Sequence, residues 1–508
     1  MTTTTRPLPL HPILLGAYWV LSLYAANLAE ADPGQVAPVL GGVVVLTAGS
    51  VLVLAPVMRD AQRAGIVAFA GWAVFFGYTY IIAVTSGTVL QGWPVRIALL
   101  LFLGTAGAAA LVRRSPLPAI TRVLNVATAV LVAITVAAVL PQEITQAIDS
   151  PPAAPVVVAT VPFKASEPPN APQRDVYFIV LDRYGSERSL ALNYGITDNG
   201  FPTWLEEHGF FVARESHANY VRTSHSLAAT LNLAYLDDVP QGNSLAIHAV
   251  GQFLKDQGYR YFHIGANVAT QTSPLADVNR RLDTTSEFAR AFLDTTLYSR
   301  LAIRLGIERL SSARQRHVEW STFQLKALAD TQAEPGPKFV FVHLLLPHPP
   351  YVYAGDGGVI SDTENARRSA AEGFREQLLY TNARMEELLE PLLRLPEAGR
   401  PIIVVSADEG PYPPRYDAVR RHGQGFDWDW SQATDEEIEI KFGILNALYL
   451  PGVDRAALYG SISPVNTFRL VFSRYFGAQL PLLPDRAFAP SPTHGGSIEI
   501  TDRLRVGS

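Results

Sequence analysis

Cysteine is absent from the 508-residue sequence, which excludes a disulfide framework, a cysteine nucleophile and thiolate ligands for a metal. Charged residues are scarce, because they make up 17% of the chain against roughly 25% in ordinary soluble proteins. A positive net charge is also missing: 46 acidic residues outnumber 41 basic ones, whereas nucleic-acid binders present a basic surface. We therefore expect no nucleic-acid partner.

The scarcity of charge belongs to one part of the chain. The first 150 residues contain seven arginines, five acidic residues and no lysine, so about 8% of them are charged. The other 358 residues hold 34 basic and 41 acidic residues, about 21%, which is close to an ordinary soluble domain. The sequence therefore predicts a membrane-embedded part followed by a water-soluble part.

The first part contains five apolar stretches, each about as long as the roughly 17–25 residues that cross a bilayer. They are residues 12–29, 37–58, 64–84, 93–112 and 123–140. The first stretch is not a cleavable signal peptide, because four more follow it. No stretch has a central acidic residue, lysine or histidine, so the bundle is more typical of an anchor than of a transporter.

The arginines of this part lie in alternate connections between the apolar stretches. They are Arg6 before the first stretch, Arg59 and Arg63 after the second, and Arg113, Arg114 and Arg122 after the fourth. The positive-inside rule then places the N-terminus in the cytoplasm and everything after Leu140 outside. We predict a multi-pass protein of the cytoplasmic membrane with a transmembrane domain over residues 1–141.

The second part begins after a linker. Residues 142–173 are rich in proline, which is typical of a stiff connection. From residue 174 to 508, short runs of β-branched and aromatic residues alternate with helical patterns, and the run VYFIVL at 176–181 is wholly apolar. This alternation predicts an extracytoplasmic α/β domain with a central, mostly parallel sheet. Chemistry in such domains lies at the carboxyl ends of the strands.

Polar side chains stand at these strand ends. Asp182 follows VYFIVL, His348 follows FVFVHLLLP, and Asp408 with Glu409 follows IIVVSA, while Thr223 directly precedes a predicted helix. Each position also has an ordinary structural explanation: a turn cap for Asp182, a helix N-cap for Thr223, and a rigid or solvated turn for the others.

The order and spacing of four motifs favour a functional role for these residues over the ordinary structural explanations. VLDRYGS, RTSHS, LLLPHPPY and VVSADEG together resemble the alkaline phosphatase superfamily in its sulfatase-like branch. The five apolar stretches, the linker and the outer domain are similar to the lipoteichoic acid synthases and related phosphoglycerol or phosphoethanolamine transferases. The resemblance covers the whole chain in architecture and residues 175 to about 475 in motifs. It implies that Thr223 is the nucleophile and that VVSADEG is a metal-binding strand end.

The chemistry of these positions fits phosphoryl transfer. At the start of a helix, unpaired N–H groups and the helix dipole favour a tetrahedral anion and an alkoxide at Thr223. Since the surrounding sequence offers no base, the hydroxyl needs a divalent metal, for which Asp182, Asp408 and Glu409 supply carboxylates beside Thr223 itself. The expected intermediate is a phospho-threonine, released to water or to an acceptor alcohol.

The chain departs from the family pattern in two ways. Glu409 stands where the family usually has a histidine, so the expected ligands are oxygen atoms, which favour Mn²⁺, Mg²⁺ or Ca²⁺ over Zn²⁺. The same replacement leaves open that the chain is a catalytically inactive relative of the family. The segment VRTSHSLAA lacks the Cys/Ser-x-Pro/Ala-x-Arg pattern that is oxidised to formylglycine in sulfatases. Hydrolysis of sulfate esters by that route is not expected.

The resemblance also assigns roles to two histidines near other motifs. His348 corresponds to a residue that touches the transferred group or protonates the leaving group, and His494, in PTHGG, to a last metal ligand in two-metal members. His343 lies inside an apolar strand, which is more typical of a core histidine than of a functional one.

Three further residues are candidates for substrate binding. Arg222 and His225 flank Thr223 and either contact the phosphate or face water. His422 belongs to the polar and aromatic loop 411–435, which we predict to be a specificity lid.

These features predict a membrane-anchored, metal-dependent enzyme that transfers or hydrolyses a phosphoester outside the cytoplasmic membrane. The expected substrates are a membrane lipid or lipid-linked donor, or a glycan-linked phosphodiester, and an alcohol acceptor. Alternatives are a sulfatase-like hydrolase of soluble phosphate or, less favoured, sulfate esters, a catalytically inactive partner in envelope assembly, and a transporter with an outer cap domain.

Overall fold

The computed structural model describes residues 6–26, 33–85, 90, 93–111, 117–149, 173–239, 243–266, 270–282, 287–305, 313–421, 428–494 and 496–505. The chain forms two compact units. The helical unit comprises residues 1–154 together with 283–316, and the α/β unit comprises residues 155–282 and 317–508. The helical unit thus includes a segment that lies within the predicted outer domain in sequence.

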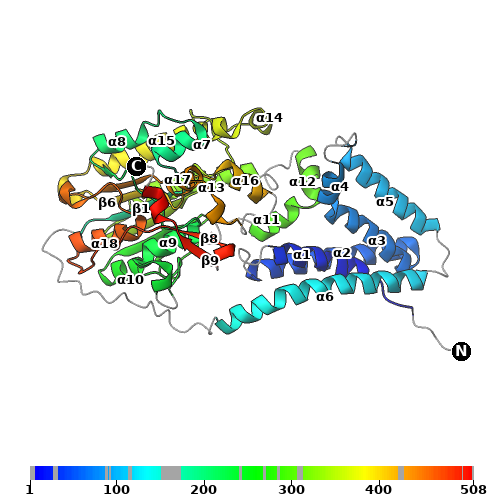
Figure 1. Cartoon of the computed structure of the whole chain (residues 1–508). Helices are drawn as coiled ribbons and strands as arrows, with labels where there is room; N and C mark the ends of the chain where they lie inside the picture. The colour runs from blue at the N-terminus through cyan, green and yellow to red at the C-terminus, as the bar shows by residue number, and fades with distance from the viewer. Residues whose placement is uncertain are drawn as a thin grey trace. The chain divides into compact units, whose positions relative to one another are not determined.

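Each of the five predicted apolar stretches coincides with helix in the helical unit (Figure 1). The helices are α1 (His11–Ala26), α2 (Pro33–Met58), α3 (Ala61–Phe76), α4 (Tyr78–Thr85), α5 (Pro94–Leu111) and α6 (Leu117–Asp149). The third stretch is divided at Gly77 into α3 and α4, which meet at an angle of 56°. In the part of the chain that is described, two helices are long and apolar enough to cross a membrane, or three if α3 and α4 form one span.

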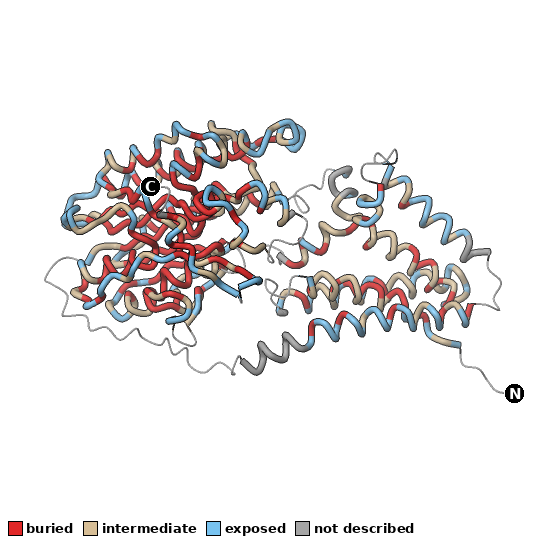
Figure 2. Tube along the Cα trace, viewed as in Figure 1, coloured by how far each residue is buried: buried red, intermediate tan, exposed pale blue. Residues whose placement is uncertain are grey.

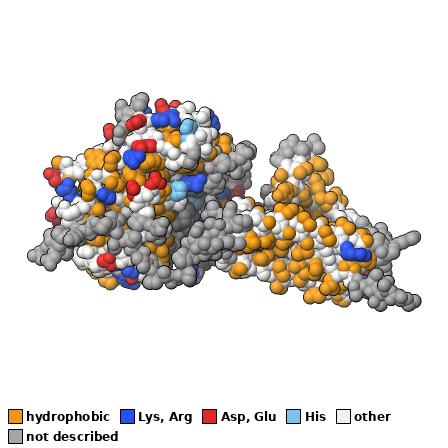
Figure 3. Space-filling view, turned by 60° about the horizontal axis from the view of Figure 1, so that its bottom comes forward, with side chains coloured by type: hydrophobic (Ala, Val, Ile, Leu, Met, Phe, Trp, Pro, Cys, Tyr) orange, Lys and Arg blue, Asp and Glu red, His pale blue; other side chains and the backbone are white. Residues whose placement is uncertain are grey.

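Many large apolar side chains on α2, α5 and α6 are exposed. Figure 3 shows hydrophobic side chains over much of the visible face of the helical unit. Such a surface is suited to lipid rather than water. Two further helices, α11 (Glu287–Asp294) and α12 (Leu297–Arg304), belong to the same unit.

The α/β unit is built on a seven-stranded sheet with the order β2-β7-β6-β1-β5-β3-β4. The strands are β1 (Val176–Leu181), β2 (Phe211–Val212), β3 (Arg260–Ile264), β4 (Val278–Arg280), β5 (Lys338–Leu344), β6 (Ile402–Ser406) and β7 (Asn446–Tyr449). The pairings from β6 through β4 are parallel, whereas β7 pairs antiparallel with both β6 and β2, so that β7 alone among these seven strands runs in the opposite direction. The predicted mostly parallel sheet is therefore confirmed.

Successive side chains of β1 enter two cores on opposite faces of the sheet. Tyr177, Ile179 and Leu181 belong to one core, whereas Phe178 and Val180 belong to the other. Burial on both faces explains why the central strands are continuous apolar runs, and Figure 2 shows the interior of this unit as almost entirely buried.

Helices cover both faces of the sheet. Among those that matter below are α7 (Glu187–Tyr194), α9 (Thr223–Asn232), α10 (Ala249–Asp256), α13 (Ala313–Thr331), α15 (Ala370–Leu393), α16 (Pro414–Arg421), α17 (Asp435–Phe442) and α18 (Pro464–Tyr475). A small hairpin of β8 (Phe488–Ser491) and β9 (Gly496–Glu499) follows α18.

Candidate metal centre and nucleophile

Three buried side chains meet at the carboxyl edge of the central strands. Asp182 follows β1, His343 is the penultimate residue of β5, and Asp408 lies two residues beyond β6. The parallel register aligns Val180 of β1 with both His343 and Ser406, so the three groups reach the same edge. Their exposed fractions are 2%, 0% and 1%, and the potential ligand atoms all lie within 4.8 Å of one another. This group could hold a metal ion.

The hydrogen bonding of the group fits a cation. Nε2 of His343 and Oδ1 of Asp182 are buried and have no hydrogen-bond partner. Nε2 of His343 is 3.5 Å from Asp182 Oδ2 and 4.0 Å from Asp408 Oδ2. Unsatisfied buried polar atoms are rare because each is costly, and a divalent ion shared by the imidazole and the two carboxylates would satisfy them.

Thr223 lies directly beside this group. Thr223 is the first residue of α9. The N-cap of this helix is Arg222, with extended backbone, and not Thr223, for which an N-cap was the ordinary structural explanation. The Thr223 hydroxyl donates a hydrogen bond of 2.5 Å to Oδ2 of Asp408. The predicted nucleophile, two predicted carboxylates and the N-terminal end of a helix therefore come together.

The two aspartates differ in their electrostatic surroundings. Burial, reinforced by the charges of Asp182 and Glu409, raises the pKa of Asp408 to about 7. Burial also disfavours the charge of Asp182, but His348, then His343 and Arg183, outweigh it and hold the pKa of that carboxyl well below its usual range. Burial opposes protonation of His343, yet the adjacent carboxylates raise its pKa overall. Asp182 is thus the permanent anion of the group.

Glu409, a predicted metal ligand, lies between two cationic side chains. Its Oε1 accepts a hydrogen bond from Arg183 Nε at 3.1 Å and forms an ion pair with Lys441 Nζ at 2.8 Å. The Arg183 guanidinium also lies 3.6 Å above the ring of Tyr412. Two buried cations therefore neutralise the Glu409 carboxylate, which stands beside the Asp182–His343–Asp408 group without joining it.

The sequence favours a core role for His343. The structure shows that His343 is buried and that it also belongs to the Asp182–His343–Asp408 group. Behind it, Nδ1 lies 2.9 Å from Thr270 Oγ1, which also accepts a hydrogen bond of 3.0 Å from the Ala266 N–H. The available signal was its place near the end of an apolar strand, five residues before His348. Lys441 and Thr270 had no motif that could have identified them.

His348 is held neutral. Burial, followed by the charge of Arg183, lowers its pKa to about 3. Its Nδ1 contacts the Pro349 carbonyl, so that nitrogen carries the proton and Nε2 keeps its lone pair. Gln377 Nε2 donates a hydrogen bond of 2.7 Å to the His348 carbonyl and fixes the loop.

The remaining predicted residues have different positions. Arg222 and His225 flank Thr223 and are half-buried, and burial followed by Arg222 lowers the pKa of His225. His494 is exposed, and its Nδ1 lies 2.9 Å from Ser491 Oγ, so it is bound within its own hairpin and is not part of the group of three. His422 lies outside the described residues.

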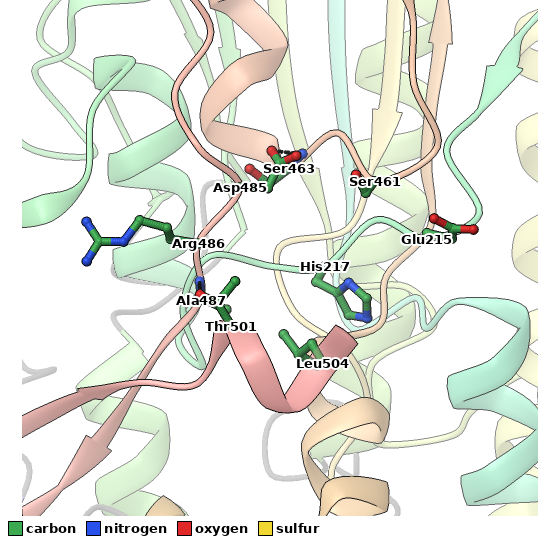
Figure 4. Close-up of a pocket in the computed structure, with 9 residues that line it drawn as sticks. All are labelled: Glu215, His217, Ser461, Ser463, Asp485, Arg486, Ala487, Thr501 and Leu504. Carbon is green, nitrogen blue, oxygen red and sulfur yellow. Dashed lines mark hydrogen bonds between the residues drawn. The ribbon is translucent and has the colours of Figure 1, made fainter. Parts of the chain in front are cut away.

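Two cavities differ in their relation to the site. One, of about 610 Å³, includes Arg183 and Pro349 in its wall together with aromatic, alanine and proline residues such as Tyr194, Tyr351 and Ala370. The other, of about 100 Å³, is shown in Figure 4 and shares no residue with the metal group. Only the first is large enough for part of an organic substrate beside the site.

No protein-family model and no curated protein matches the chain. Among solved structures, the zinc complex of the C-terminal periplasmic domain of EptC from Escherichia coli is 16% identical, with a TM-score of 0.44, over 66% of this chain and 95% of that one.

The integral membrane protein lipooligosaccharide phosphoethanolamine transferase A from Neisseria meningitidis is 12% identical, with a TM-score of 0.45, over 93% and 94% of the two chains. The phosphonate monoester hydrolase of Agrobacterium radiobacter is 13% identical, with a TM-score of 0.38, over 63% and 81%.

Proposed function

We propose that this chain is a membrane-anchored, metal-dependent enzyme that transfers or hydrolyses a phosphoester through a phospho-threonine. The observation that carries the proposal is the hydrogen bond of 2.5 Å from Thr223 to Asp408, at the start of α9 and beside the buried group of Asp182, His343 and Asp408. A hydroxyl, an acceptor for its proton and a place for a cation are thus together.

Asp182, His343, Asp408 and the Thr223 hydroxyl would hold the metal. When bound, a divalent ion lowers the pKa of a hydroxyl beside it and offsets negative charge on phosphate oxygens. The charge of Glu409 is already neutralised by Arg183 and Lys441, so we leave it out of the ligand set.

The residues of the chain then divide the work. As Thr223 Oγ1 bonds to phosphorus, its proton moves along the existing hydrogen bond to Asp408, and the bond from phosphorus to the leaving oxygen breaks. The proton passes from Asp408 to that oxygen, which leaves as an alcohol. Water or an acceptor alcohol next attacks the phospho-threonine and restores the Thr223 hydroxyl.

His348 takes a binding role in this scheme. Because it is neutral, it is poorly suited to protonate the leaving group. Its free Nε2 lone pair can instead accept a hydrogen bond from the hydroxyl of the incoming water or alcohol. The cavity of about 610 Å³ beside Arg183 offers room for one of the two organic groups.

The apolar helices support a donor that resides in the membrane, either a lipid or a lipid-linked phosphodiester. In this proposal the N-terminus is cytoplasmic and the α/β unit is extracytoplasmic, as the arginine distribution predicts. The acceptor is an alcohol, with water as the alternative that makes the enzyme a hydrolase.

The test is turnover of bis-p-nitrophenyl phosphate by the full-length protein with Mn²⁺, Mg²⁺, Ca²⁺ or Zn²⁺. Replacement of Thr223 by Ala should lower the rate by about 10³-fold or more, because the reacting group is lost. Ser224→Ala, one residue further along the same helix, is the matched control and should retain most of the activity. A p-nitrophenyl phosphoryl group on Thr223, detected by mass spectrometry after rapid acid quench, would identify the intermediate, and equal rates for Thr223→Ala and the native protein would refute it.

A further inference from the structure

The sequence leaves the α/β unit after β4 and returns to it with α13, and residues 283–316 between them belong to the helical unit. The chain therefore passes between the units at three places, after residues 154, 282 and 316. A protein tethered by one linker would need only the first passage. The other two arise because α11 and α12 pack on the apolar helices.

The contact of α11 is a specific apolar one. Phe288 and Phe292, four residues apart and thus on one helix face, are 5% and 4% exposed. They form one cluster with buried residues of four helices: Val20 and Tyr24 of α1, Val36 and Val43 of α2, Phe76 of α3, and Val139 of α6.

Ring geometry and a hydrogen bond fix the position of α11. The ring of Phe288 meets that of Tyr24 edge to face at 6.3 Å, and the ring of Phe292 lies 5.7 Å from that of Phe76. The Phe288 N–H donates to Gln35 Oε1 at 3.3 Å. Tyr24 and Phe76 stand near the C-terminal ends of α1 and α3, and Gln35 near the start of α2, so the contact lies at the end of the bundle that the arginine pattern predicts to be extracytoplasmic.

We propose that α11 and α12 form a docking arm that ties the chain of the α/β unit to the apolar helices through two further connections, and that this tether serves turnover of a phosphoester embedded in the membrane. This inference rests on the proposed function for its substrate. Charge alone would not hold the α/β unit at a membrane, because its residues 155–282 and 317–508 carry 28 basic and 37 acidic groups and biological membrane surfaces are anionic. Additional connections raise the effective concentration of one unit at the other.

The first experiment tests whether α11 contacts the apolar helices. Because the chain has no cysteine, only the introduced thiols can be cross-linked. Phe76→Cys combined with Phe292→Cys, at positions whose native rings lie 5.7 Å apart, should be joined by a short bis-maleimide cross-linker in the full-length protein in membranes. A protease site inserted into residues 150–172 reports the bond, because the cross-linked halves then stay together on a denaturing gel. The control is Val57→Cys with Phe292→Cys: Val57 lies 22 residues beyond Gln35 in α2, about 33 Å away.

Cross-linking of most of the protein in the first pair and of none in the control is expected. Equal yields, or no cross-link in either, would overturn the arm whatever the chemistry of the site.

The second experiment tests what docking does. Phe288→Ala/Phe292→Ala should turn over soluble bis-p-nitrophenyl phosphate within twofold of the native rate, which shows that the α/β unit is folded. Its turnover of phosphatidylethanolamine or phosphatidylglycerol in vesicles should fall at least tenfold. Leu301→Ala, which alters an exposed side chain of α12, is the matched control and should change neither rate.

Equal loss of both activities, no loss in either, or a native protein active only on the soluble ester would overturn the positioning role. A native protein that turns over neither substrate would instead refute the proposed function, and the cross-link would still decide whether the arm docks.

Discussion

The ion pair of Glu409 and Lys441 offers a sharp test of the site's electrostatics. Their side chains are 3% and 0% exposed, and the Lys441 ammonium has a second contact in the Gly410 carbonyl at 3.3 Å. We consider two substitutions that keep side-chain size, Glu409→Gln and Lys441→Met, and their combination.

The expected size of the effect follows from the distances. At 2.8 Å the attraction between Glu409 and Lys441 is about 6 kcal/mol for an effective dielectric constant near 20, and the desolvation of both charges offsets much of it. Removing one partner leaves the other charge buried, which typically costs about 3–5 kcal/mol. Lys441→Met should lie near the lower figure because Arg183 still faces Glu409, whereas Glu409→Gln leaves two buried cations together and should lie near the upper figure.

The double variant distinguishes an ion pair from two independent contributions. With both charges gone, the cost should be at least about 2 kcal/mol less than the sum of the single variants. The assay is urea unfolding of the full-length protein in detergent, followed by tryptophan fluorescence, which reports the α/β unit through buried Trp430. Lys326→Met, which removes an exposed pair with Asp330, is the control and should have little effect.

Additive costs, or a Lys441→Met variant as stable as the native protein, would refute this reasoning. The same preparations can be titrated with metal. Glu409→Gln should still bind the ion, because in our proposal Glu409 is not a ligand, and loss of binding in this variant alone would return Glu409 to the ligand set.

Two further predictions concern the metal. In the metal-free protein Asp408 keeps a proton up to a pKa of about 7, whereas the unfolded chain releases it near 3.9. The free energy of unfolding without metal should therefore fall as the pH rises from about 4 to about 7. Metal affinity should rise by up to about tenfold per pH unit in the upper part of this range, because binding of the ion expels the proton from Asp408. Calorimetric metal titrations that show no pH dependence would contradict this. Thr270→Val removes the hydroxyl 2.9 Å from His343 Nδ1 and should weaken metal binding by about 10–100-fold, with recovery in Thr270→Ser, whereas an unchanged affinity would show that the contact does not orient His343.

The fold was largely predictable because its determinants are local. Continuous apolar runs identify β1, β5 and β6 as strands buried on both faces, and the apolar stretches identify the helices of the first unit. The break between α3 and α4 was not visible, since hydropathy continues unchanged across Gly77. The attachment of residues 283–316 to the helical unit was also missed, because it depends on which distant surface the two phenylalanines of α11 meet.

The site divides in the same way. Asp182, Thr223 and Asp408 each follow or begin a recognisable element, and the structure brings them together as their strand-end positions predict. The cations around Glu409 could not be predicted, because Arg183 looks like an ordinary turn residue and Lys441 lies 32 residues away at the end of α17.

This exchange of partners changes the expected metal chemistry. With Glu409 as a ligand, the set would consist of oxygen atoms alone and would favour Mg²⁺, Mn²⁺ or Ca²⁺. In the ligand set that we propose, with Glu409 paired to Arg183 and Lys441, two carboxylates and a hydroxyl combine with the imidazole of His343. One nitrogen donor makes Zn²⁺ and Mn²⁺ better candidates than Ca²⁺. Two aspartates also match the charge of a single divalent ion, so the buried cations beside Glu409 reduce the negative charge available to attract a second.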